Sequence, residues 1–390
     1  MRELHRLHIL RLLRERGPAS RADLARATGL SRPTIASIVA ELLETSAIRE
    51  AGKGSSHTRK GRPSQLLAVT PPQGLVLSVD IGHTHVRTVV ADASGHVVQE
   101  RVATFEQRLA VEQALDEAGG LIAEVAAAAE VGATGNAGGV IGATVGLPSP
   151  VGMTGRPFAA RFGDLDPLEF LGLDAYTDQV RILNDADLGA VGEAAFGAGT
   201  PFGTFIYVKI SHGVGAGLIL GGRLYRGRGY AGNIGHIRVV DDGDVCICGN
   251  RGCLETVASS AALIRALQPA HPGVSLGFTD LVRLANAGDR GTRALLADTG
   301  RTIGRALSTL VTALNPDAII VGGALGSLGG PALRGIREAL ERYSEPAALH
   351  DLVVTTAGCG VHAEALGGVA LTFGLVEDFG SVAITKNQDT

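Results

Sequence analysis

The first part of the chain carries short amphipathic patterns separated by sharp turns. Over residues 3–16, leucine and isoleucine recur at helical spacing, which predicts a helix that Gly17 ends. A second helix, RADLARATG, begins after Ser20, and a third begins after Ser31, because serine is a favoured N-cap residue. The third helix is expected to bury one apolar face, made of Ile35, Ile38, Val39 and Leu42.

The second and third helices have the pattern of a helix-turn-helix. The small Ala25 lets two helices cross closely, Gly29 reverses the chain, and Ile35 fills the angle between the helices. The third helix is then the recognition helix of a DNA-binding domain. Its early exposed residues are the ones able to reach base edges in a major groove: Arg32, Thr34 and Ser37. A helical bundle or a protein-docking module is the alternative interpretation.

A wing is predicted after the third helix. Two short strands flank a basic tip rich in glycine and serine, within KGSSHTRKGRPSQLLAV. In that tip, Lys60 and Arg62 belong to a Lys-Gly-Arg-Pro segment of the kind that lies in a DNA minor groove. A solvated loop is equally compatible with this stretch. Residues 1–70 are therefore predicted to form a winged helix-turn-helix domain.

From Gly74 onward, buried strands alternate with helices, which is typical of an α/β fold. A strand, a glycine-rich turn and a returning strand begin at Leu75, and the same order recurs from Thr204. This repetition predicts two related lobes, over residues 71–195 and 196–390. The remaining elements are expected near residues 96–105, 110–131, 139–151, 180–187, 260–267, 279–287, 291–314, 318–330, 331–342, 352–357 and 363–376.

The strand expected at 180–187 runs into Asn184 and Asp185, immediately before a helical stretch. Two roles are open to Asp185 there. It could cap the helix, which is a common use of aspartate. It could also be a general base, because open α/β folds bind their ligands at the carboxyl ends of strands.

Three of the four cysteines lie within residues 229–259, together with a histidine. Three thiolates and an imidazole at such short spacing suit a tetrahedral zinc site, with His236, Cys246, Cys248 and Cys253 as ligands. Glycines between the cysteines let the chain turn tightly around an ion. Four protein ligands leave no open position, so a structural zinc is expected rather than a catalytic one. Buried cysteines that pack as small hydrophobic side chains are the alternative.

Charge is unevenly distributed along the chain. Residues 1–65 carry 13 basic and 6 acidic side chains, a net of +7, whereas the remainder carries 22 and 33, a net of −11. A basic head on an acidic body favours double-stranded DNA as a partner. No apolar run of about 18 residues occurs, and the N-terminus lacks the apolar core of a signal peptide. A cytoplasmic protein that does not span a membrane is expected.

Together these features resemble one family, the ROK proteins, which include repressors and sugar kinases. The resemblance covers nearly the whole chain and is most specific in GNIGHIRV and CICGNRGCLE, which look like the family's signature around its zinc ligands. It implies an actin-like ATPase fold, also found in sugar kinases, with two α/β lobes and a cleft between them. The winged head is what the family's repressors carry and its free-standing kinases lack.

The resemblance also implies roles for individual residues. The sugar would be held by a polar set made of Asn184, Asp185, Asn233, His236 and Glu255. In a kinase, Asp185 would be the general base. ATP would bind three glycine-rich loops, which correspond to Asp80, Gly82 and Thr84, to Gly213 and Gly215, and to Gly322, Gly323 and Ala324.

Three positions depart from the kinase pattern. His83 and His212 replace small residues of the first two nucleotide loops, so side chains project where phosphate oxygens would approach the backbone. Asn233 stands where kinases have a glutamate, and losing that carboxylate removes a charge-assisted hydrogen bond worth roughly 1.5–3 kcal/mol. The two histidines argue against ATP binding, whereas the change at Asn233 alters sugar binding without excluding it, because Asn184, Asp185, His236 and Glu255 remain. Asp185 is then expected to accept a hydrogen bond from a hydroxyl without acting as a base.

The expected function is that of a transcriptional repressor, acting on carbohydrate-metabolism genes, that senses a sugar or sugar derivative. Ligand would change the angle between the lobes and shift the population of head arrangements able to hold two half-sites. A homodimer or homotetramer is expected, because a dimer matches a near-palindromic operator. The alternative is an ATP-dependent sugar kinase that also carries a DNA-binding head.

Overall fold

A computed structural model describes residues 5–6, 9–10, 12–13, 17–45, 47–53, 65–70, 74–106, 108–131, 139–158, 162–323, 326 and 330–378. The chain divides into two compact units, Met1–Gln73 and Gly74–Thr390, which we call the head and the body. No helix of the described residues is long and apolar enough to cross a membrane.

The helices of the head begin at the serines that the sequence indicates. Helix α2 (Arg21–Thr28) starts at Ser20, which forms a capping box with Asp23. It ends at Gly29, whose φ of 70° lies in the left-handed region that glycine reaches without strain. Helix α3 (Arg32–Glu44) has its N-cap at Ser31 and buries the apolar face expected of it.

The head buries one apolar core between its helices and a small sheet. Its fully buried large side chains come from all of these elements and include Ile9, Leu24, Ile35, Ile38, Leu42, Ile48 and Leu67. The sheet has the order β1-β3-β2, with β1 (Ala19–Ser20), β2 (Ile48–Lys53) and β3 (Gln65–Val69). The antiparallel pair of β2 and β3 forms the predicted wing strands, whereas Lys60 and Arg62 lie outside the described residues.

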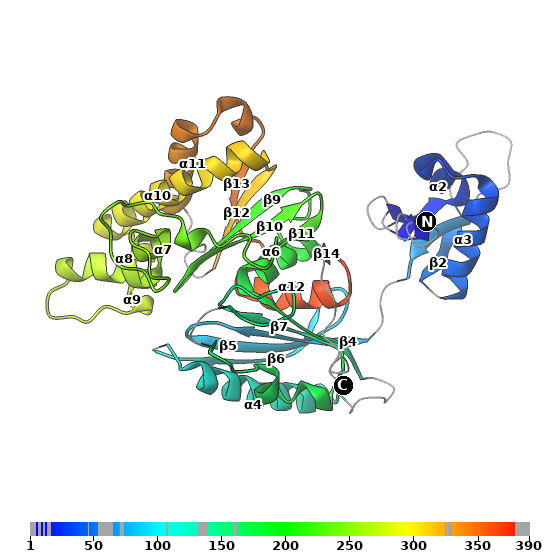
Figure 1. Cartoon of the computed structure of the whole chain (residues 1–390), viewed down its shortest axis with the longest axis horizontal. Coiled ribbons are helices and arrows are strands. Elements are labelled where there is room, and N and C mark those ends of the chain that lie inside the picture. The colour runs from blue at the N-terminus through cyan, green and yellow to red at the C-terminus, as the bar shows by residue number, and fades with distance from the viewer. Residues whose placement is uncertain are drawn as a thin grey trace. The chain divides into compact units, whose positions relative to one another are not determined.

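The first lobe of the body is built on a five-stranded sheet of order β6-β5-β4-β7-β8. Three strands form an antiparallel meander, and two run parallel to β4. The strands are β4 (Leu75–Ile81), β5 (His85–Ala91), β6 (Val97–Thr104), β7 (Val140–Leu147) and β8 (Val180–Asn184). Helix α4 (Val111–Ala128) covers the outer face of this sheet and packs its apolar side against it (Figure 1).

The second lobe repeats this topology. Its sheet has the order β13-β12-β9-β10-β11-β14, in which β9, β10 and β11 form the meander and β12 and β13 run parallel to β9. The strands are β9 (Phe205–Ile210), β10 (Val214–Leu220), β11 (Arg223–Tyr225), β12 (Ala318–Gly322), β13 (Val353–Thr356) and β14 (Glu377–Asp378). The two related lobes predicted from the recurring hairpin are therefore present, and β14 is an edge strand that the sequence did not predict.

The helices of the second lobe lie after its meander and around its parallel strands. They are α7 (Leu254–Ala258), α8 (Ser260–Leu267), α9 (Phe278–Asn286), α10 (Arg290–Leu314) and α11 (Gly330–Tyr343). Helices α10 and α11 pack against each other on the outer side of this lobe (Figure 1). The short helix α7 was not predicted, and it begins directly after the last cysteine of the predicted zinc segment.

Two helices, one from each repeat, lie between the sheets (Figure 1). Helix α6 (Asp185–Phe196) follows β8, and α12 (Ala363–Thr372) follows β13, the equivalent strand of the second repeat. They approach closely because Gly192 and Gly367 have no side chain, and a Cβ at either would overlap the other helix's backbone. Helix α12 also packs on β4 and β7, so it does not belong wholly to the second lobe as the sequence suggested.

Candidate functional site

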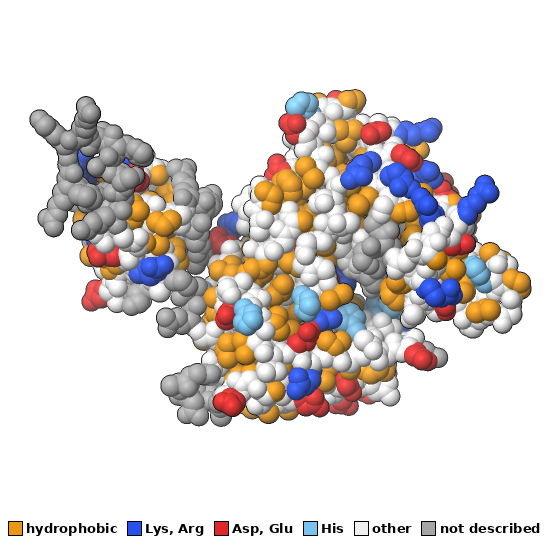
Figure 2. Space-filling model, turned by 180° about the vertical axis from the view of Figure 1, so that it is seen from behind, with side chains coloured by type: hydrophobic (Ala, Val, Ile, Leu, Met, Phe, Trp, Pro, Cys, Tyr) orange, Lys and Arg blue, Asp and Glu red, His pale blue; other side chains and the backbone are white. Residues whose placement is uncertain are grey.

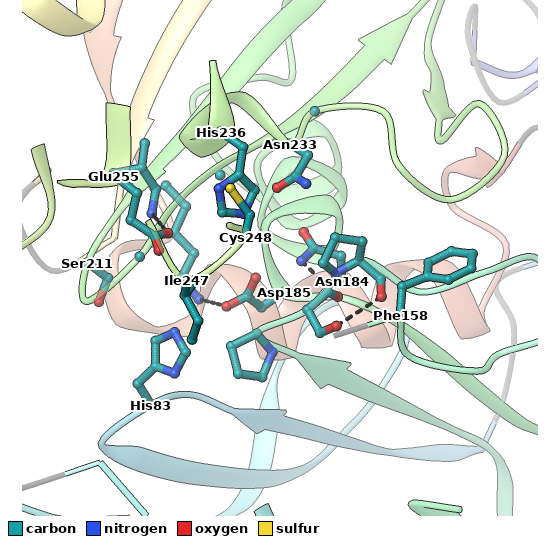
Figure 3. A pocket seen from close by; sticks show the side chains of 18 of the residues that line it. His83, Phe158, Asn184, Asp185, Ser211, Asn233, His236, Ile247, Cys248 and Glu255 are labelled. Atoms are coloured by element: carbon teal, nitrogen blue, oxygen red, sulfur yellow. Dashed lines mark hydrogen bonds and ion pairs between the residues drawn. The ribbon is translucent and has the colours of Figure 1, made fainter. Parts of the chain in front are cut away.

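A cavity of about 550 Å³ lies where the two lobes meet. Its walls include all five residues predicted to hold a sugar: Asn184, Asp185, Asn233, His236 and Glu255. Figure 3 shows these side chains around one cavity, although they come from several separate segments. Histidine, basic and acidic side chains gather on the face where the lobes meet (Figure 2). Polar side chains that converge on one cavity can fix the orientation of a hydroxyl-rich ligand.

Asn184 and Asp185 have different roles at the junction of β8 and α6. Asn184, not Asp185, is the N-cap: its Oδ1 accepts hydrogen bonds from the backbone N–H of Ala186 (2.9 Å) and Asp187 (3.3 Å). Asn184 Nδ2 also donates to the Ser149 carbonyl (3.1 Å). The interpretation of Asp185 as the cap is thus wrong. Asp185 is the first helical residue, where the positive end of the helix dipole favours its carboxylate.

The Asp185 carboxylate belongs to a buried charge cluster, which we define as Asp80, His85, Asp185, Lys209 and Glu364. Lys209 Nζ lies 2.9 Å from Asp185 Oδ2 and 3.0 Å from Glu364 Oε1. Asp80 Oδ2 lies 2.8 Å from His85 Nε2. Lys209 and Glu364 were not predicted. The signal for Lys209 was a lysine inside an otherwise apolar strand, FIYVKI, and every residue of that strand is buried in the structure.

Burial and neighbouring charges shift the pKa values of the cluster's groups in opposite directions. Burial disfavours the ionised Asp80 carboxylate, but the positive charges of Lys209 and His85 outweigh this and hold the pKa of Asp80 at about 2. Burial also disfavours the Lys209 ammonium, yet Asp185 and Glu364 keep the pKa of Lys209 well above its usual range. Burial raises the pKa of Glu364, and Lys209 only partly opposes that rise. Lys209 is therefore a charged ammonium group in the floor of the cavity.

Glu255 connects the cavity to the cysteine segment. It lies in the first turn of α7, and its Oε2 accepts a hydrogen bond from Val214 N (3.1 Å) at the end of the β9–β10 turn. A Cβ at Gly213 would lie 2.9 Å from the same carboxylate oxygen, so glycine lets the turn approach it. Cys253, the last of the predicted metal ligands, is the N-cap residue of the helix that carries Glu255.

The four predicted metal ligands come together beside this cavity, which His236 and Cys248 line. The ligand atoms of His236, Cys246, Cys248 and Cys253 all lie within 4.8 Å of one another, and none of the cysteines forms a disulfide. His236 Nδ1 lies 3.5 Å from Cys246 Sγ, which leaves Nε2 free to face elsewhere. At Gly252 the chain adopts φ 67°, and a Cβ there would overlap the Val240 carbonyl. Three thiols and an imidazole at these distances can hold a metal ion.

Only some residues of the three predicted nucleotide loops line the cavity. Gly82, Gly213 and Gly215 line the cavity, whereas Asp80, Thr84, Gly322 and Gly323 are not among its lining residues, and Ala324 lies outside the described residues. A Cβ at Gly82 would overlap the His85 ring, which occupies the space beneath the first loop. A Cβ at Gly322 would overlap the Tyr207 ring, so this glycine serves packing inside the second sheet.

Two aromatic side chains form one wall of the cavity and were not predicted. The rings of Phe158 and Tyr230 lie 4.6 Å apart, and both remain about half exposed. Exposed aromatic faces beside polar groups are suited to pack on the C–H faces of a sugar ring. The sequence offered one signal for them: aromatic residues make up only 4% of the chain, so each one was worth weighing as a ligand contact.

The predicted DNA-contacting residues lie at the start of α3 in the head. Arg32 and Ser37 are exposed, and Thr34 is half-buried, with its hydroxyl 2.8 Å from the Ser31 hydroxyl. Residues in the first turns of a recognition helix are those that contact base edges in a major groove.

Comparison with known proteins agrees with this division into head and body. The model of the ROK family matches residues 76–374, and a model of winged helix-turn-helix DNA-binding domains matches residues 2–49. The xylose repressor of Bacillus subtilis is 29% identical over 368 residues, which cover 92% of each chain.

Solved structures show the same relationship. The chain resembles a ROK family transcriptional regulator, described as a homologue of the Escherichia coli Mlc protein, with a TM-score of 0.76 and 26% identity over 95% of this chain and 96% of that one. It also resembles a ROK family glucokinase from Streptomyces griseus, solved with glucose and AMPPNP, with a TM-score of 0.63 and 27% identity over 76% of this chain and 99% of the glucokinase. The kinase therefore corresponds to the body without the head.

Proposed function

Because the chain belongs to the ROK family, we propose that it is a DNA-binding transcriptional repressor controlled by a sugar or sugar derivative. The observation that carries the proposal is the combination of two sites in one chain. The head presents a recognition helix, and the body gathers five polar residues around one cavity. A repressor that responds to a sugar needs both sites, whereas a kinase needs only the second.

In this proposal the sugar lies between the lobes. Asp185 and Glu255 accept hydrogen bonds from its hydroxyl groups, and Asn184 donates its second Nδ2 hydrogen to one of them, because its Oδ1 is taken by the cap. Asn233 and His236 complete the ring of polar contacts. Phe158 and Tyr230 cover one face of the sugar. A ligand that contacts both lobes changes their relative angle, and this change alters which arrangements of two heads are populated.

We assign the cysteine segment to zinc, held by His236, Cys246, Cys248 and Cys253. The donor set supports this assignment, because three thiolates with one imidazole favour zinc over harder cations. When bound, the ion would fix the loop that carries His236 and the start of the helix that carries Glu255. Its contribution is then structural support for two sugar contacts rather than chemistry on the ligand.

The head would act as one of a pair on DNA. Arg32, Thr34 and Ser37 would contact base edges in the major groove, and Lys60 and Arg62 of the wing tip would enter a minor groove. A homodimer or homotetramer would read two half-sites about 10 bp apart, or a multiple of that spacing, near carbohydrate-metabolism genes.

Binding to DNA in the presence of sugars tests the proposal directly. Operator fragments would first be selected from genomic DNA with the full-length protein, and their affinity then measured by fluorescence anisotropy with D-xylose, D-glucose or N-acetyl-D-glucosamine added. We expect affinity to fall steeply with salt and to change with at least one sugar. Salt-insensitive binding, or a protein that no sugar affects, would contradict the proposal.

The second candidate function is an ATP-dependent sugar kinase that carries a DNA-binding head. The observation in its favour is that Asp185 lines the cavity at a strand end, as a general base would. A coupled assay for ADP release with the same sugars separates the two functions. Turnover that the D185A variant abolishes would favour the kinase.

A further inference from the structure

Lys209 is the one ammonium group among the described residues that lines the cavity, and its surroundings are unusual. It lies in β9, is 7% exposed, and reaches the cavity floor beside Asp185. A lysine is rarely buried to this extent unless it is paired. Its two partners, Asp185 and Glu364, come from the two helices that lie between the sheets.

The hydrogen-bonding capacity of Lys209 is not exhausted by these partners. A lysine ammonium has three N–H donors. In the described part of the chain, two of them are accounted for, by Asp185 Oδ2 at 2.9 Å and Glu364 Oε1 at 3.0 Å. Because a buried ammonium is costly to leave partly unpaired, the third donor calls for an acceptor on the cavity side.

The charges around Lys209 restrict what that acceptor can be. Asp80, Asp185 and Glu364 contribute three carboxylates near Lys209, whereas His85 and Arg87 contribute positive charge beside Asp80. An anion that accepted from Lys209, such as a phosphate or a carboxylate, would also lie beside the Asp185 carboxylate, which is 2.9 Å from the ammonium and would repel it. A neutral hydroxyl would not be repelled. It can also accept from Lys209 while donating to Asp185, whose Oδ2 lies beside the ammonium.

We propose that Lys209 is a specificity-determining residue that, together with Asp185, binds one free hydroxyl group of the sugar. The proposal rests on the proposed function, because it requires a sugar in the cavity. It adds that the hydroxyl at this position must be neither absent nor phosphorylated. Lys209 thereby links the ligand to both lobes, since it lies in the second sheet, and Asp185 begins α6 directly after the last strand of the first.

A pair of variants separates this role from a purely structural one. E364Q removes one carboxylate from a residue that does not line the cavity, and it keeps Lys209. K209M/E364Q removes one positive and one negative charge, so the remaining carboxylates are not left with an added net charge. Calorimetric titration would use the tightest-binding of D-xylose, D-glucose and N-acetyl-D-glucosamine, and then its series of monodeoxy analogues.

We expect K209M/E364Q to bind the parent sugar at least about tenfold more weakly than E364Q does, as for loss of a hydrogen bond to a charged group. One deoxy analogue should bind E364Q about tenfold more weakly than the parent sugar does. It should bind K209M/E364Q less than about threefold more weakly than the parent sugar, because its missing hydroxyl is the one that Lys209 holds. Equal binding by the two variants would overturn the proposal. So would an equal loss for every analogue, since that pattern indicates a structural role alone.

Circular dichroism and operator affinity would establish that the variants are folded. If K209M/E364Q does not fold, K209R keeps the positive charge while its planar guanidinium places the donors differently. We expect K209R to lose the discrimination against the same deoxy analogue, and unchanged discrimination would overturn the proposal. If the unsubstituted protein binds none of the sugars, the proposed function itself fails. If it binds them but the Lys209 variants behave like their controls, only the assignment of Lys209 fails.

Discussion

The imidazole rings of His83 and His212 meet edge to face where the two lobes approach each other, with centroids 6.3 Å apart and planes inclined by 68°. The two residues are equivalent in the repeated topology, because each lies in the turn between the first two strands of its lobe. By the resemblance to the family's kinases, we expect these turns to correspond to the first two nucleotide loops. A nucleotide in this position would have to separate the rings.

The histidine contact predicts that sugar binding ignores nucleotide. We expect a non-hydrolysable ATP analogue to change the dissociation constant for the sugar by less than about threefold in calorimetric titrations. The H83G/H212T variant removes both rings and should bind the analogue more tightly than the unsubstituted protein. If the analogue strengthens sugar binding tenfold without any substitution, the nucleotide loops are functional and the kinase interpretation gains support.

The cysteine segment predicts that metal loss affects the sugar before it affects DNA. C248S removes an exposed thiol of the metal cluster, so a direct packing defect is small. We expect the variant to lose zinc in elemental analysis and to bind sugar more weakly, because His236 and Glu255 lose their support. Operator affinity should change little. C359S is the matched control, since Cys359 lies outside the cluster, and a control that loses as much zinc would contradict the assignment.

The recognition helix predicts where DNA specificity lies. R32A should weaken operator binding by about 1–3 kcal/mol and relax the preference at one base position, if the side chain reads a base edge. Fluorescence anisotropy on operator and mutated operator DNA would measure both effects. R283A replaces an exposed arginine on α9 of the body and should leave binding unchanged. Weakening that is uniform across sequences, with a shallower salt dependence, would mean that Arg32 contacts phosphate instead.

Asp80 predicts that the body loses stability in acid. Its pKa in the fold, about 2, lies below the ordinary value of 3.8, so the ionised carboxylate contributes stability that is complete above about pH 4 and lost as the pH falls toward 2. A depression of this size corresponds to roughly 2 kcal/mol. D80N should lower the free energy of unfolding at pH 7 and flatten its decline in acid. Chemical denaturation followed by circular dichroism, with D116N on the exposed face of α4 as control, would check this; a D80N protein with an unaltered acid profile would refute it.

Features that depend on neighbouring residues were predictable from the sequence. The caps at Ser20 and Ser31 are formed by residues within one helical turn, and the four residues of the histidine and cysteine cluster lie within one short segment. Each of the two similar hairpins is likewise formed by neighbouring residues, and their recurrence indicated two lobes. In these cases the partners are close in the chain, so their spacing constrains the geometry before any tertiary contact forms.

The choice between adjacent residues was not predictable. Asn184 and Asp185 can both cap a helix, and only the backbone conformation of Asn184, with φ −69° and ψ 143°, decides that it is the cap. Because Asn184 is the cap, the Asp185 carboxylate is available to pair with Lys209. The sequence shows two competent residues, whereas the fold assigns one role to each.

The sequence determined the winged head, the α/β lobes, the members of the histidine and cysteine cluster and the identity of the polar residues around the cavity. Only the tertiary structure decided that Lys209 pairs with Asp185 and Glu364, and that His83 meets His212. These partners are far apart in the chain and meet because α6 and α12 pack between two sheets. Local patterns specify what each element buries, but the pairing of buried charges depends on which elements finally share an interior, where an uncompensated charge is too costly to keep.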